Sequence, residues 1–344
     1  MKRGMKAASS AAAAVVLVGG GLYGWWNTDV FGQGSFCNEA IASDEISGVL
    51  DGQGRLSAAT QYESKDPYGF RCTVQRTSKF VGGAQPSVGI DLTSDSVSAP
   101  FGSRLWKNPS ALSYLKGDNA AGGASTTRAW LLLPSSCWEK FSSRQGAVPT
   151  VTVALRHGQA TEGQLMGLAF SAAGHIAKSV GCPAPPRPDS IEFAAPSPAN
   201  PSRQPKRTEA DEVCGLKGFT LPRDALINAQ LAPGTERATS TGARTWACDL
   251  DLEGPGGPQL GFALSQNPDV VAGVRRDTSP GGRYLKVLKC EEGAMFVTTT
   301  ANDAYDDVAL DAWEGTKGDK FGEVRAQLLE SFADAAAADR GCDG

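Results

Sequence analysis

Two five-residue stretches decide the fold: residues 70–74 read FRCTV, and residues 246–250 read WACDL. In each stretch an aromatic residue, a cysteine and an aliphatic residue occupy alternate positions, so their side chains point to the same face of a β-strand. An earlier cysteine precedes the one in each stretch at nearly the same distance, because Cys37 lies 35 residues upstream in the first case and Cys214 lies 34 residues upstream in the second. The repetition predicts two related units.

Both units continue in the same order. An apolar run leads to a third cysteine, at residues 130–137 and 284–290, and an apolar stripe of helical spacing then leads to a closing Gly-Cys, at 181–182 and 341–342. We expect an α+β fold of two similar units, each an antiparallel sheet of about four strands with helices packed on one face. Opening helices are expected near residues 40–50 and 223–231.

All eight cysteines lie after residue 26, and no two of them are within four residues of each other. Such spacing is typical neither of zinc sites nor of a Cys-x-x-Cys redox pair. Four cysteines in a unit allow three pairings, and the sequence alone does not choose among them. If each bond fastens a helix to the sheet, the pairs run in sequence order: Cys37–Cys72, Cys137–Cys182, Cys214–Cys248 and Cys290–Cys342.

Eight of the 20 prolines lie between Cys182 and Cys214. A segment this rich in proline favours an extended, semi-rigid conformation. We therefore place a linker at residues 183–210, between a first unit at 27–182 and a second unit at 211–344.

The N-terminus has the pattern of a membrane anchor. Residues 1–6 carry Lys2, Arg3 and Lys6, and residues 7–26 contain no charged side chain. Twenty residues of helix span about 30 Å, the thickness of a bilayer core, and the preceding positive charges place residues 1–6 in the cytoplasm. The alternative is a cleaved signal peptide, which would make the protein secreted. In both cases the bulk of the chain is extracytoplasmic, where disulfides persist.

The charge argues against nucleic acid as a partner. The chain has 344 residues, with 33 basic residues against 37 acidic ones, a formal net charge of −4. Without the three basic residues of the N-terminus, 30 basic residues remain against 37 acidic ones, so the exterior part carries −7. Nucleic-acid phosphates favour basic surfaces instead.

No set of catalytic residues emerges from the sequence. The only histidines, His157 and His175, have no counterpart in the second unit, and hydrogen bonding or solvation explains them best. Ser113 and Lys116 match a Ser-x-x-Lys spacing but lack the accompanying Lys-Thr-Gly motif, so we treat the match as chance. We predict no catalytic residues, no metal site and no cofactor.

Three features are weaker candidates for binding. An acidic run resembles a calcium-binding loop only in composition, and a solvated acidic face is the alternative; it comprises Asp303, Asp306, Asp307, Asp311 and Glu314. Four tryptophans could line a cleft or belong to the core; they are Trp106, Trp130, Trp138 and Trp313. Residues 95–124 have no equivalent in the second unit, and this insertion could act as a lid, a partner surface or a second small core layer.

The anchor, the Pro-rich spacer and the aromatic-x-Cys pattern resemble a group of actinobacterial, Streptomyces-like, membrane-anchored extracytoplasmic domains of unknown function, here present as a tandem duplicate. That resemblance implies no catalytic residues. The expected partners are the lipid bilayer, through the N-terminal helix, and an envelope component or partner protein.

We thus expect a non-enzymatic cell-surface protein that binds a ligand, an envelope component or another protein. One alternative is a cell-wall hydrolase that uses carboxylates such as Glu139 or Glu162. The other is a purely structural envelope spacer.

Overall fold

The computed structural model of the chain describes most residues after the N-terminus. The described ranges are 32–52, 54–62, 69–78, 85–96, 109–117, 120–141, 147–194, 204–239, 243–276, 284–314 and 318–343. The predicted anchor at residues 7–26 and the preceding residues 1–6 lie outside these ranges. Across the ranges that are described, no helix combines the length and apolarity needed to cross a bilayer.

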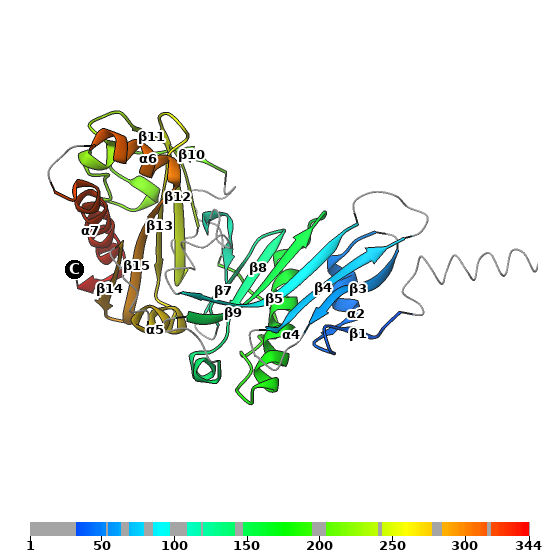
Figure 1. Ribbon diagram of the computed structural model, residues 1–344. Coiled ribbons are helices and arrows are strands. Elements are labelled where there is room, and N and C mark those ends of the chain that lie inside the picture. Colours follow the sequence, from blue (N-terminus) through cyan, green and yellow to red (C-terminus); the bar gives the residue numbers. More distant parts are fainter. Residues whose placement is uncertain are drawn as a thin grey trace, which may run out of the picture.

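Seven strands of the first unit form one antiparallel sheet (Figure 1). Their order in space is β3 (Arg55–Tyr62), β4 (Arg71–Thr77), β5 (Ser87–Ser96), β9 (Ala147–Arg156), β8 (Arg128–Leu132), β7 (Gly122–Ala124) and β6 (Ser113–Tyr114). A separate small pair joins β1 (Ser35–Phe36) to β2 (Ile41–Ala42). The unit's helical elements are α2 (Ser43–Val49), η4 (Pro109–Ala111), η5 (Ser135–Lys140) and α4 (Glu162–Ser179).

Seven strands of the second unit form another antiparallel sheet. Their order is β10 (Lys206–Arg207), β11 (Ala232–Ala238), β12 (Thr245–Glu253), β13 (Gln259–Ser265), β15 (Gly293–Ala301), β14 (Leu285–Cys290) and β16 (Cys342–Asp343). The helical elements here are η6 (Val213–Gly215), η7 (Arg223–Leu226), α5 (Pro268–Arg276), α6 (Asp303–Ala312) and α7 (Lys320–Arg340).

The α+β class and the two antiparallel sheets agree with the sequence prediction, but the expected number of strands was too low. Five strands follow the same order in both sheets, β3-β4-β5-β9-β8 in the first and β11-β12-β13-β15-β14 in the second. The remaining strands at the sheet edges have only two or three residues each. Such short segments cannot show an alternating pattern, which is why sequence periodicity missed them.

The alternation in the WACDL stretch sets the two faces of the second sheet. On β12, Trp246, Cys248 and Leu250 are fully buried in the core beneath α6 and α7. Ala247 lies between them on the opposite face and is also buried, in a different cluster. Because both faces of this strand are covered, side chains at successive positions are buried.

The closing helices form as predicted, each with recognisable ends. The Thr161 side chain accepts a hydrogen bond from the Gln164 backbone N–H at 3.2 Å and caps the start of α4. Gly341 ends α7 in the left-handed conformation, with φ of 64°. The second opening helix is only the 3-10 turn η7, because Ile227 already has a left-handed backbone with φ of 51°.

The helices of the second unit do not all lie on one face, contrary to the prediction. Figure 1 shows α7 on the side of the second sheet that is remote from the first unit. Helix α5 instead contributes Val270, Val271 and Val274 to the opposite face. There they form a core shared by the two units. The first unit supplies to it Leu112, Tyr114, Ala121, Trp130, Leu132, Trp138 and Val148, and the second supplies Ala247, Ala263, Val270, Val271, Val274 and Phe296.

Polar contacts reinforce this interface. The Ser110 backbone N–H donates to Asp249 Oδ2 at 3.2 Å, and the Ser110 hydroxyl donates to the same oxygen. The Ser135 backbone N–H donates to Asp269 Oδ1 at 3.0 Å. The described part of the insertion is therefore a core layer between the units. Phe101, Leu105 and Trp106, which also belong to the insertion, lie outside the described residues.

The four disulfides follow the predicted sequential pairing. Their Cα–Cα separations are 5.4 Å for Cys37–Cys72, 5.4 Å for Cys137–Cys182, 5.9 Å for Cys214–Cys248 and 3.8 Å for Cys290–Cys342. Each bond stays inside one unit.

The described parts of the predicted linker are attached to the units. Phe193 forms a β-bridge with Leu115, and the Ala194 backbone N–H donates to the Tyr114 carbonyl at 2.9 Å. At the other end, β10 pairs with β11 along the edge of the second sheet. Of the predicted linker, only residues 195–203 lie outside the described ranges.

Candidate functional site

A hollow of about 460 Å³ opens between the insertion and the start of the linker, and we call it the linker hollow. Leu115 and Ala120 come from the insertion, Phe170 comes from α4, and Pro186 and Pro188 come from the linker. These apolar groups line it together with Lys116, Arg187, Asp189, Ser190 and Glu192. Five of these ten lining residues are apolar and five are polar or charged, and the volume is within the range of small-molecule sites.

Main-chain pairing holds the linker against the insertion. The Lys116 backbone N–H donates to the Glu192 carbonyl at 3.0 Å, beside the Leu115–Phe193 bridge. The hollow is bounded on that side by two paired segments 76 residues apart in the chain. Its walls are therefore set by backbone hydrogen bonds as well as by side chains.

The two cationic side chains around the linker hollow each lie beside a carboxylate. Lys116 Nζ lies 3.3 Å from Glu192 Oε2, and Arg187 Nη1 lies 3.2 Å from Glu45 Oε1. Arg187 Nη1 also donates to the Ser171 hydroxyl at 3.0 Å, and Ser171 donates to Glu45. Both cations of the lining thus have a carboxylate partner.

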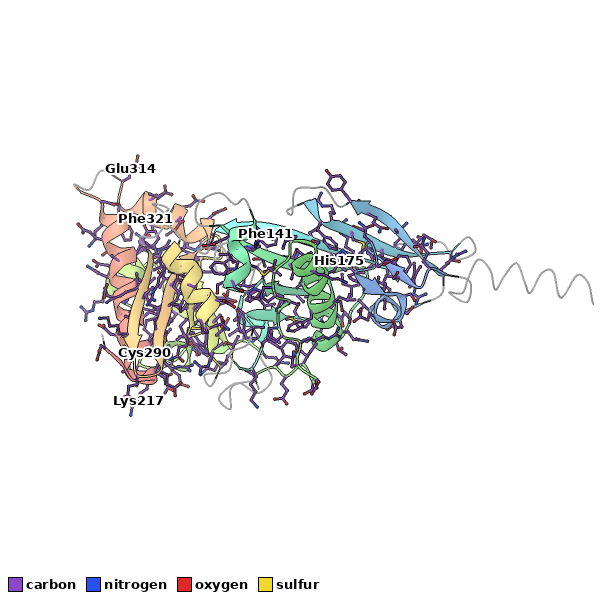
Figure 2. The ribbon with its side chains drawn as sticks, turned by 90° about the horizontal axis from the view of Figure 1, so that it is seen from below. Phe141, His175, Lys217, Cys290, Glu314 and Phe321 are labelled. Atoms are coloured by element: carbon purple, nitrogen blue, oxygen red, sulfur yellow. A yellow bond between two sulfur atoms is a disulfide. The ribbon has the colours of Figure 1, made fainter. Side chains whose placement is uncertain are left out.

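A second hollow, of about 470 Å³, lies between α6 and α7. Trp313 and Phe321 meet there edge to face, with ring centroids 6.5 Å apart. Figure 2 shows Glu314 and Phe321 near one end of the second unit, whereas Phe141 and His175 lie in the first. Lys320 belongs to the lining, and its ammonium group is bound by Asp224.

The acidic run is distributed along α6 and the turn that follows it, as a solvated face would be. Asp306 is the member with a buried partner, because Arg325 Nη1 lies 3.1 Å from its Oδ1. Partial burial raises the pKa of Asp306, and the Arg325 charge opposes that rise. Within the described ranges no three His, Cys, Asp or Glu side chains come together as a metal site would require.

Buried ionisable groups elsewhere have structural partners. Asp249 lies at the interface between the units, and burial raises its pKa while the two hydrogen bonds from Ser110 oppose the rise. Glu236 is 1% exposed, and burial raises its pKa as well. The Cys214 backbone N–H donates to Glu236 Oε2 at 2.8 Å, and Lys206 Nζ lies 3.3 Å from its Oε1.

The other sequence candidates are scattered. His157 is exposed at the end of β9 with φ of 57°, and His175 on α4 lies 6.1 Å from the Phe70 ring. Ser113 is buried on β6, whereas Lys116 is exposed at the linker hollow.

The two carboxylates of the hydrolase alternative lie on different elements. Glu139 is exposed on η5, and Glu162 is the first residue of α4.

The four candidate tryptophans do not form one cleft. Trp130 and Trp138 belong to the core between the units, and the Trp138 indole N–H donates to the Leu133 carbonyl at 2.8 Å. Trp313 lies at the α6–α7 hollow, and Trp106 is outside the described residues.

Comparison with family models, with curated proteins and with solved structures finds no match to this chain. Its site must therefore be argued from its own geometry. Sequence reasoning pointed to the insertion but missed Phe170 and the linker charges. The available signal was the presence of Arg187, Asp189 and Glu192 inside an otherwise Pro-rich segment.

Proposed function

We propose that the protein is a non-enzymatic, membrane-anchored cell-surface protein that binds a small ligand in the linker hollow. The observation that carries this proposal is the hollow itself, where the insertion of the first unit meets the linker around Leu115, Ala120 and Phe170. In the second unit the corresponding connection, between β13 and β14, holds α5 instead, so the prediction that the insertion has no equivalent there was wrong. The four disulfides support an extracytoplasmic location, since such bonds persist outside the cytoplasm.

The two units are further proposed to be a tandem duplicate. The common order of five strands and the corresponding places of the four disulfides support this origin. The likeness to actinobacterial surface proteins stays a prediction. Since the residues that line the linker hollow come from the first unit and the linker, binding would belong to that part of the chain.

The test is a ligand-observed NMR screen of a small-molecule fragment collection against the full chain in lipid nanodiscs. Ala120→Trp places a large side chain in the hollow and is expected to remove the signal of bound fragments. Ala184→Trp makes the same change at an exposed linker position outside the lining and is expected to preserve it. The proposed site would be refuted if fragments bound both variants equally, or if no fragment bound the parent protein.

A structural spacer is the second candidate, and the core between the units favours it because that core makes the two units one body. A strain that carries Ala120→Trp distinguishes the two. A spacer keeps its cellular role when the hollow is filled, whereas a binding protein loses it.

A further inference from the structure

We infer that the linker hollow selects an organic cation, namely a small molecule with an apolar body and one amine head group. This inference rests on the proposed function and names the class of ligand for the same site. It follows from which charged side chains around the hollow already have partners.

An anionic ligand would meet a carboxylate beside both cations of the lining. Glu192 lies 3.3 Å from the Lys116 ammonium nitrogen and offsets its charge. Glu45 offsets the charge of Arg187, and its hydrogen bonds with Arg187 and Ser171 link the linker to α2 and α4. The remaining N–H groups of both cations can still donate, but an anion bound there is also repelled by the neighbouring carboxylate.

A cationic ligand instead meets one carboxylate of the lining that no cation among the described residues offsets. Among the described residues, the Asp189 carboxylate has neither an ion pair nor a hydrogen bond, although it lines the hollow directly after Pro188. A ligand ammonium group can bind this carboxylate without breaking an ion pair. The neighbouring Ser190 hydroxyl also lines the hollow and can accept a hydrogen bond from the same ammonium group.

The apolar lining selects the rest of the ligand. Phe170 is 3% exposed and Leu115 is 8% exposed, so these side chains are held in place by packing rather than free to move aside. Pro186 and Pro188 add apolar surface in a backbone with restricted φ angles. An aryl or alkyl group attached to the amine would lie mainly against the exposed Pro186 and Pro188, and against the small open parts of Leu115 and Phe170. The net charge of the exterior part is negative, which also favours the approach of cations.

Three probes of similar size and shape test the head group: 2-phenylethylamine, 2-phenylethanol and 3-phenylpropanoate. Affinities are measured by NMR titration of the full chain in nanodiscs, with empty nanodiscs as the blank because the amine partitions into lipid. We expect the amine to bind about five-fold more tightly than the alcohol, as one exposed ion pair allows. The anion is expected to bind most weakly.

Asp189→Asn should reduce the amine to the affinity of the alcohol. Asp211→Asn, which makes the same charge change at an exposed position in the second unit, should leave the preference intact. Glu192→Gln releases Lys116 and should raise the affinity of 3-phenylpropanoate several-fold.

Equal binding of the three probes, or an amine preference that survives Asp189→Asn, would overturn the cation assignment. In that case fragments excluded by Ala120→Trp would still support the hollow as a binding site. If no probe binds while other fragments do, the assignment also fails. If nothing binds at all, the proposed function fails with it.

Discussion

The hydrogen bond between Ser110 and Asp249 joins the two units, and its removal has a calculable cost. Ser110→Ala removes the hydroxyl donor but keeps the backbone N–H bond at 3.2 Å. A hydrogen bond to a charged group contributes about 1.5–3 kcal/mol, and the partly buried Asp249 carboxylate favours the lower half of that range. Ser110 is fully buried, so water does not replace the hydroxyl. We expect a loss of about 2 kcal/mol in the free energy of unfolding.

Urea denaturation at neutral pH, followed by tryptophan fluorescence, measures this cost. Ser136→Ala, at an exposed position on η5, is the matched control and should stay within about 0.5 kcal/mol of the parent. A double-mutant cycle with Asp249→Asn isolates the pair, and we expect a coupling energy of at least about 1 kcal/mol. Equal costs of Ser110→Ala in the parent and in the Asp249→Asn background would refute the reasoning, as would a cost as small as that of the control.

Further predictions follow from burial and covalent linkage. Because burial raises the pKa of Asp249, its contribution to stability is fully present below its unfolded pKa and is lost as pH rises through its folded pKa. The free energy of unfolding, measured upward from about pH 4, should thus fall more steeply in the parent than in Asp249→Asn. Parallel curves for the two proteins would contradict this. Replacing Cys137 and Cys182 together by serine opens a 45-residue loop and should cost about 4 kcal/mol in thermal or urea unfolding, and a loss below about 1 kcal/mol would argue against the bond. The buried Tyr305 hydroxyl donates to the Ala225 carbonyl at 3.0 Å, so Tyr305→Phe should lower the free energy of urea unfolding by about 1 kcal/mol, and an unchanged midpoint would show that the bond contributes nothing.

The predictable parts of the fold are those encoded by local patterns. Alternating apolar residues located β4 and β12, and helical stripes before Gly-Cys located α4 and α7. The pairing of the cysteines followed from one mechanical assumption, that each bond fastens a helix to its sheet. These features require only neighbouring residues, or pairs whose spacing recurs in both units.

The parts that could not be predicted depend on contacts between distant segments. Ala247 and Ala263 read as the outward positions of half-buried strands, and only the docking of the first unit buries them. Helix α5 carries valines at 270, 271 and 274, a spacing that fits a helix face, but nothing local indicates which side of the sheet it covers. The linker hollow likewise brings together Ala120, Phe170 and Pro186, which no motif connects.

The core shared by the two units has a practical consequence for anyone who divides the chain. A cut in residues 195–203 separates two halves that each contain a complete set of disulfides, and each half would look like an independent domain. Each half would nevertheless expose an apolar face in water, with Trp130 and Trp138 on one and Phe296 with the α5 valines on the other. Isolated halves should therefore bind hydrophobic dyes and self-associate, and mixing them should restore a single soluble species.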